Sequence, residues 1–99
     1  MLKISDFAED TATTTVTYRK HKVEFTFRPG AYTGELARDA QRAAEVIAKC
    51  VTEWNVDSPL TVEELEKLPA GLIAAVYDSV RDLSMQAGLG EAPANSPTG

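Results

Sequence analysis

The chain has 99 residues, of which 43% are hydrophobic and 25% are charged, and its formal net charge is −5 at pH 7. A chain of this length forms one domain around one modest core. The negative charge argues against a general binder of nucleic acid or of an anionic membrane, which both attract positive surfaces, and no apolar stretch approaches the roughly 20 residues that span a bilayer.

Two β-strands are predicted first. Residues 13–18 are rich in β-branched and aromatic types, and residues 22–28 alternate between apolar and polar side chains. The connection at residues 19–22 lacks the glycine or asparagine of a tight primed turn, so we expect a four-residue loop. Pro29 and the glycine after it then end the second strand.

The apolar side chains of the two strands predict their register. Pairing Tyr18 with Val23, and Val16 with Phe25, places these four residues and Phe27 on one face of the hairpin. A slip of one residue would move each apolar side chain of one strand to the opposite face. We therefore expect this register and an apolar face that packs on the core.

A long amphipathic helix is predicted over residues 34–54, with Thr33 as its N-cap. Its apolar positions follow the spacing of a helix face. Acidic and basic side chains occupy the opposite face, and the alanine-rich middle would allow another element to approach closely. The apolar positions are Leu36, Ala40, Ala43, Ile47, Cys50 and Trp54.

A short helix and a second long helix follow. Thr61 and Glu64 form a capping-box pattern that opens a short helix ending near Lys67. Pro69 suits the first turn of the next helix, which we expect to end near Ala87. Its apolar face consists of Leu72, Ile73, Val76, Val80 and Leu83, and Gly88 is the expected C-terminal cap.

The predicted fold class is therefore α+β: an N-terminal β-hairpin followed by two long amphipathic helices with a short helix between them. Residues 1–89 form a single domain, and residues 90–99 are expected to be disordered because they hold little to bury. Two strands cannot cover two long amphipathic helices. We therefore expect exposed apolar surface and self-association into a homo-oligomer.

The chain shows no pattern of a catalytic, cofactor-binding or metal-binding site, and we expect a protein that is not an enzyme. The single cysteine, Cys50, stands 29 residues from the single histidine, His21, and its place on an apolar helix face favours a core thiol. One cysteine and no apolar signal sequence fit a reducing compartment, where the protein is made.

One local cluster of positive charge stands out, at the predicted hairpin loop. Arg19, Lys20 and Lys22 favour a solvated tip, or an electrostatic contact to an acidic partner surface such as the helices of another copy. Nucleic acid is the weakest reading, because no aromatic platform accompanies these charges.

A series of motifs, in a fixed order along the chain, carries information beyond fold class. Residues 23–33 lead into a charged helix, whose predicted end at residues 50–57 contains Trp54 and Asn55. Pro59-Leu60-Thr61, Leu65 and Leu68-Pro69 follow in that order. This order, over about residues 14–85, resembles the small tail assembly chaperones of long-tailed bacteriophages, in particular those that infect actinobacteria. The chain departs from that family at Asn55, where an aspartate is usual, and in the shortened acidic loop at residues 57–58.

The resemblance implies a non-catalytic helper of virion assembly in the host cytoplasm, absent from the mature virion. Its implied partner is the long helical tape-measure protein, which such chaperones keep soluble, and a second is the tail-tube protein. Two other classes stay open: a structural virion protein, such as a connector or tail component, and a host-directed inhibitor that binds a protein.

For the partner surface we predict mainly the last helix. Core packing predicts the same apolar face, so the residues beside it, Tyr77 and Met85, discriminate between the two. Trp54 is a further candidate, as a core residue or as an interface anchor. The predicted partner-binding residues are Leu72, Ile73, Val76, Tyr77, Val80, Leu83, Met85 and Trp54.

Overall fold

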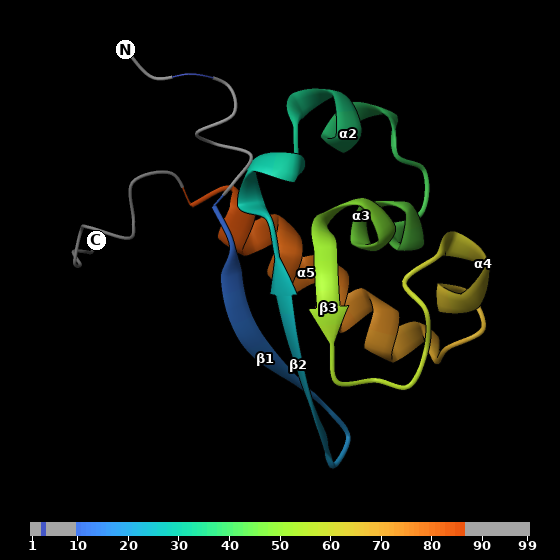
Figure 1. Ribbon diagram of the computed structural model, residues 1–99. Coiled ribbons are helices and arrows are strands. Elements are labelled where there is room, and N and C mark those ends of the chain that lie inside the picture. Colours follow the sequence, from blue (N-terminus) through green and yellow to red (C-terminus); the bar gives the residue numbers. More distant parts are fainter. Residues whose placement is uncertain (1–2, 4–9, 87–99) are drawn as a thin grey trace.

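The computed structural model describes residue 3 and residues 10–86 and shows a small α+β fold. An antiparallel sheet of order β1-β2-β3 packs against helices on one face, with α5 crossing behind it in Figure 1. The last helix ends at Ser84, before the predicted end near Ala87. The predicted cap at Gly88 and the tail at residues 90–99 lie outside the described residues. The elements are β1 (Ala12–Tyr18), β2 (His21–Phe27), the 3-10 helix η1 (Pro29–Ala31), α2 (Gly34–Asp39), α3 (Ala43–Cys50), β3 (Val51–Trp54), α4 (Val62–Leu65) and α5 (Ala70–Ser84).

The hairpin forms with the predicted faces but a different register. Val16 pairs with Val23 and not with Phe25, and Tyr18 pairs with His21, so the strands are shifted by two residues from the prediction. A shift of two residues preserves the face of each side chain. Phe25 and Phe27 are buried as expected.

The predicted four-residue loop is wrong, because only residues 19 and 20 connect the strands. Arg19 adopts a positive φ of 58°, which a two-residue hairpin turn requires at its first central position. Arginine accepts this left-handed conformation without the help of glycine. In return, the short turn lengthens both strands, which add the pairs Thr17 with Lys22 and Tyr18 with His21.

The predicted helix over residues 34–54 is also wrong, since the segment forms α2, α3 and β3. The backbone is extended at Ala40 (ψ 128°) and at Arg42 (ψ 144°), which separates α2 from α3. Thr33 caps α2 as predicted, accepting a hydrogen bond at Oγ1 from the Leu36 N–H at 3.1 Å. Only one long helix, α5, is present among the described residues.

The helix ends at Cys50 because the next four residues join the sheet. β3 pairs antiparallel with β2, with Trp54 beside Phe25 and an irregularity between Thr26 and Phe27. Val51 and Thr52 are β-branched and favour a strand. Sheet hydrogen bonds thus outweigh the helical spacing of the apolar positions, and Val51 is buried in the strand.

Asn55 ties the end of β3 to β2. Its Oδ1 accepts from the Glu24 N–H at 3.0 Å, its own N–H donates to the Glu24 carbonyl at 3.1 Å, and its Nδ2 donates to the Lys22 carbonyl at 3.3 Å. Asn55 therefore continues the hydrogen bonding between β2 and β3 beyond the last residue of β3.

The last two helices begin close to their predicted positions. Thr61 caps α4, since its Oγ1 accepts from the Glu64 N–H at 3.3 Å, and Pro69 directly precedes α5. Gly71 in the first turn of α5 lies against Tyr18 of β1, where a Cβ would stand 2.7 Å from Cε1 of the ring. The missing side chain lets α5 approach the sheet closely.

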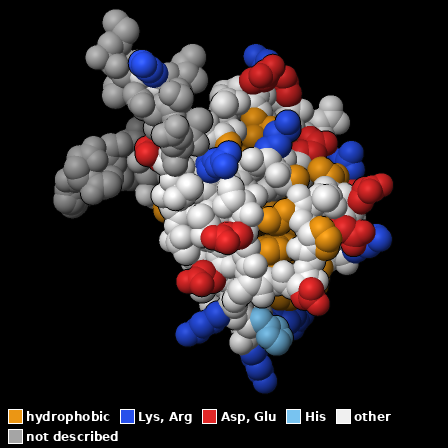
Figure 2. Space-filling model, in the orientation of Figure 1, with side chains coloured by type: hydrophobic (Ala, Val, Ile, Leu, Met, Phe, Trp, Pro, Cys, Tyr) orange, Lys and Arg blue, Asp and Glu red, His pale blue; other side chains and the backbone are white. Residues whose placement is uncertain are grey.

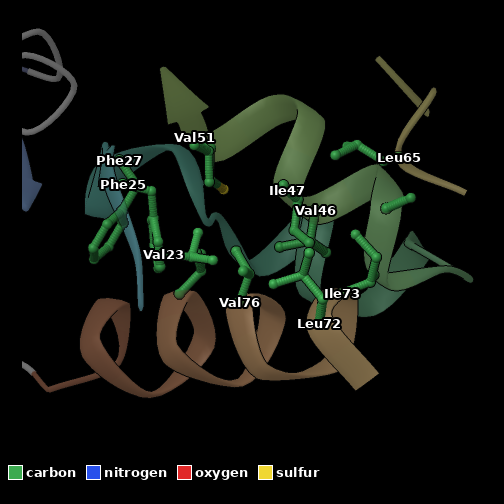
Figure 3. Packing of buried hydrophobic residues seen from close by; sticks show 13 residues of the cluster. Val23, Phe25, Phe27, Val46, Ile47, Val51, Leu65, Leu72, Ile73 and Val76 are labelled. Carbon is green, nitrogen blue, oxygen red and sulfur yellow. The ribbon is translucent and has the colours of Figure 1, made fainter. Parts of the chain in front are cut away.

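The core lies between α5 on one side and the sheet and α3 on the other (Figure 3). Among the described residues, the large hydrophobic side chains that stay exposed are Leu83 and Met85. The third strand covers apolar surface that a two-stranded hairpin would leave open. Self-association into a homo-oligomer stays a prediction.

Candidate functional site

A groove of about 540 Å³ lies between α3, α4 and α5, and we call it the α3–α4–α5 groove. Its lining is mainly apolar, and four of its residues are alanines. Because alanine side chains are short, the helices leave room between them that larger residues would fill. The lining residues are Arg42, Ala43, Ala44, Leu65, Glu66, Leu68, Ala70, Ile73 and Ala74.

Arg42 and Glu66 are the charged residues of this groove, and they bind each other. The Arg42 Nη1 lies 2.9 Å from both carboxylate oxygens of Glu66, and the Arg42 Nε lies 3.4 Å from Glu45 Oε2. The hydrogen bond that Arg42 donates to Glu66 raises the pKa of the Arg42 guanidinium, and the negative charges of Glu66 and Glu45 raise it further. Because these side chains are exposed, solvent screens the pair and it adds little to the stability of the fold. It joins the start of α3 to the end of α4.

Four predicted partner-binding residues of α5 belong to the core in this fold. Leu72, Ile73, Val76 and Val80 are at most 9% exposed. Of these four, Ile73 also contributes to the lining of the α3–α4–α5 groove. Their apolar face therefore serves the interior, which is the alternative that core packing predicted.

The other predicted partner-binding residues of the last helix, Tyr77, Leu83 and Met85, are at least partly exposed. Met85 is 67% exposed and Leu83 is 36% exposed. Tyr77 is half-buried and is held by its neighbours, since the Arg81 guanidinium lies 5.4 Å from its ring centroid. Burial and a hydrogen bond with Tyr77 raise the pKa of Tyr32. Arg81 itself pairs with Asp82 at 3.0 Å.

Trp54 lies in β3 and is half-buried. Its Nε1 donates to the Ser58 carbonyl at 3.0 Å, which ties the strand to the loop that follows. This internal hydrogen bond satisfies the indole, so Trp54 has a structural role in the fold.

The basic residues Arg19, Lys20 and Lys22 all lie exposed at the hairpin turn. The Arg19 guanidinium lies 5.8 Å from the Tyr18 ring centroid. Figure 2 shows blue side chains and the pale-blue histidine gathered at this tip.

Cys50 is buried at the end of α3. Burial raises the pKa of its thiol from 9.0 to about 11, against a smaller opposing effect of Lys49. A thiol in this environment stays protonated at neutral pH and is a poor nucleophile. Within residues 10–86, the acidic, histidine and cysteine side chains form no cluster of three that could hold a metal ion.

The residues that line the α3–α4–α5 groove were not predicted as a site, apart from Ile73. A signal was present, because alanines recur in residues 43–48 and 70–75 and indicate close approach of helices. That pattern alone does not reveal whether the space between two helices is filled or open. Side-chain volume in three dimensions decides this.

Comparison of the chain with protein-family models, with curated proteins and with solved structures finds no match. No helix within residues 10–86 has the length and the apolar character that crossing a bilayer requires. The candidate site therefore rests on the geometry of the α3–α4–α5 groove and on the motifs of the chain.

Proposed function

We propose that this chain is a non-catalytic protein-binding module and that it acts as a tail assembly chaperone, which holds the tape-measure protein in solution during phage tail assembly. The observation that carries the proposal is the apolar α3–α4–α5 groove on an otherwise charged, acidic chain. The motifs at residues 23–33 and 50–69, which resemble those of tail assembly chaperones, support the choice of partner.

An apolar groove between helices suits a helical partner. Amphipathic helices bind in this mode by placing apolar side chains at helical spacing into a groove. Leu65 and Ile73 form the buried floor of the groove, whereas the half-buried Leu68 offers apolar contact to a partner. The alanines leave space for the incoming side chains. A helical tape-measure protein would present such side chains repeatedly along its length.

The charges beside the groove suit a chaperone as well. Glu66 lines the groove beside Arg42, and Glu45 contacts Arg42 from α3. Glu64 of α4 pairs with Lys67 at 3.3 Å. These side chains are solvated, so they keep the surface of a complex hydrophilic while the apolar side chains of the client are covered.

Co-expression with a candidate tape-measure protein tests the proposal. Ala74→Glu places a carboxylate in the groove at a position that is exposed on α5, so we expect the variant to fold and the soluble client to fall to the level seen without chaperone. Ala37→Glu makes the same substitution at an exposed position of α2 outside the groove and should solubilise the client like the parent protein.

The outcomes separate the possibilities. If Ala74→Glu folds and still solubilises the client, the groove is not the binding site. Met85→Ala and Tyr77→Ala then test the edge of α5, where Met85 is exposed. If the parent protein leaves the client insoluble and is found in purified virions, a structural virion protein replaces the chaperone.

A further inference from the structure

The sheet has an open edge at β1. Within residues 10–86, β1 pairs with β2 on one side and with no strand on the other. A strand at the edge of a sheet presents a row of backbone N–H and C=O groups that can pair with another strand. The edge strand is seven residues long, whereas natural proteins often keep an exposed edge strand very short.

The hydrogen bonds of Glu24 show which groups of β1 face outward. Both backbone groups of Glu24 bind Asn55, so they point away from β1. Its partner in the register is Thr15, and residues opposite each other in an antiparallel pair turn their backbone groups in the same sense, inward or outward. The N–H and C=O of Thr15 therefore face the open side. Those of Thr13 and Thr17 do so as well, because backbone groups two residues apart in a strand point to the same side.

The sequence of β1 contains none of the features that protect an edge. Residues 12–18 include no charged residue, no proline and no glycine. Natural proteins block strand pairing with lysine, proline, bulges or short strands. The opposite edge shows such features: β3 has four residues, includes the exposed Glu53, and pairs irregularly at Thr26 and Phe27.

A second copy of the chain fits this edge. In antiparallel pairing centred on Thr15, Thr15 meets Thr15 of the second copy and Thr13 meets its Thr17, so threonine faces threonine along the solvated face. Cross-strand threonine pairs are favourable, and the pairing brings no like charges together within β1. The contact is self-complementary, as a two-fold interface requires.

We propose that two copies of this chain associate through antiparallel pairing of β1 with β1, centred on Thr15, to form one continuous six-stranded sheet. The two-fold axis of such a pair is perpendicular to the sheet. Both helical layers, with their α3–α4–α5 grooves, therefore lie on the same face. The inference is independent of the proposed function, because it rests on the sheet edge and not on the groove.

Substitution at the centre of the contact tests the pairing. Thr15→Lys changes an exposed side chain and retains the backbone of the hairpin, but it places two lysines opposite each other at the two-fold axis. We expect the dissociation constant of the dimer to rise by roughly tenfold or more. Thr52→Lys, at an exposed position of β3, is the matched control and should leave the dimer unchanged. Light scattering over a concentration series should give twice the 10.7 kDa chain mass for the parent protein and for this control.

Hydrogen exchange and crosslinking give independent readouts. The amides of Thr13, Thr15 and Thr17 should become protected as concentration rises through the dimerisation range. Thr15→Cys should form a disulfide-linked dimer under mild oxidation, whereas Thr52→Cys should not, and the buried Cys50 should not interfere.

Three results would overturn the proposal: a parent protein that is monomeric at high micromolar concentration, a dimer that Thr15→Lys does not weaken, or protection of the three threonine amides that is independent of concentration. The last result would mean that the edge is paired within one chain. If Thr15→Lys fails to fold, crosslinking through Thr15→Cys decides the question. Loss of client binding in the groove variants would not affect any of these readouts.

Discussion

At the scale of single residues, β2 divides its side chains sharply between the core and the solvent. Phe25 is 1% exposed and packs on Phe27, with ring centroids 5.8 Å apart. Thr26, between them, points to the other face, where its Oγ1 shares a hydrogen bond of 2.8 Å with Thr13. The alternation makes neighbouring residues differ strongly in their contribution to stability.

Phe25→Ala should therefore lower the free energy of unfolding by about 3–5 kcal/mol, because it removes a buried ring and leaves a cavity. Thr26→Ala should cost under about 1 kcal/mol, since it removes one solvated hydrogen bond. Urea denaturation followed by circular dichroism measures both. Equal losses at the two positions would show that the faces of β2 are assigned wrongly.

At the scale of elements, the most informative segment is residues 34–54. Its apolar residues recur at helical spacing, yet the chain leaves the helix at residues 40–42 and again at Val51. The Gln41 N–H donates to Glu45 Oε1 at 3.0 Å, which gives the start of α3 a polar partner at the break. α2 contributes no buried residue, whereas α3 buries Ala44, Val46, Ile47 and Cys50.

The attachment of β3 depends on Asn55. Asn55→Ala should lower the free energy of unfolding by about 1–2 kcal/mol, because it removes the acceptor of the Glu24 N–H and the donor to the Lys22 carbonyl. Asn55→Asp retains the acceptor and should recover part of this loss. The measurement is equilibrium denaturation of the three proteins at one pH. An unchanged stability in Asn55→Ala would mean that β3 is held by its backbone pairing alone.

At the scale of the whole molecule, the thiol of Cys50 links stability to pH. Its pKa is 9.0 when unperturbed and about 11 in the fold, because burial disfavours the thiolate. Below pH 9 the thiol is protonated in both states and stability is complete. Between pH 9 and about 11 only the unfolded chain ionises, so the free energy of unfolding falls by on the order of 2–3 kcal/mol.

Denaturant titrations at intervals from pH 8 to pH 11 test this linkage. Cys50→Ala is the control, since it lacks the thiol but retains the tyrosines that ionise in the same range. The two proteins are compared in how their free energy of unfolding changes with pH, because loss of the buried sulfur lowers the stability of Cys50→Ala at every pH. Parallel pH profiles for the two proteins would contradict the expected effect.

Local patterns sufficed for the features that neighbouring residues control. The faces of the hairpin, the caps at Thr33 and Thr61 and the apolar face of α5 follow from alternation, from side-chain acceptors and from helical spacing, and each was predicted. The helical spacing likewise predicted a core position for Cys50, which is buried.

The tertiary structure decided what depends on distant residues. Val51 fits either a helix face or a strand, and only the presence of β2 beside it selects the strand. The register of the hairpin could shift by two residues without moving any side chain to the other face, so the pattern could not distinguish the two pairings. The α3–α4–α5 groove could not be read from the sequence because it is the space between three elements. Such a space is set by how closely the helices approach, and spacing along one chain segment carries no measure of that distance.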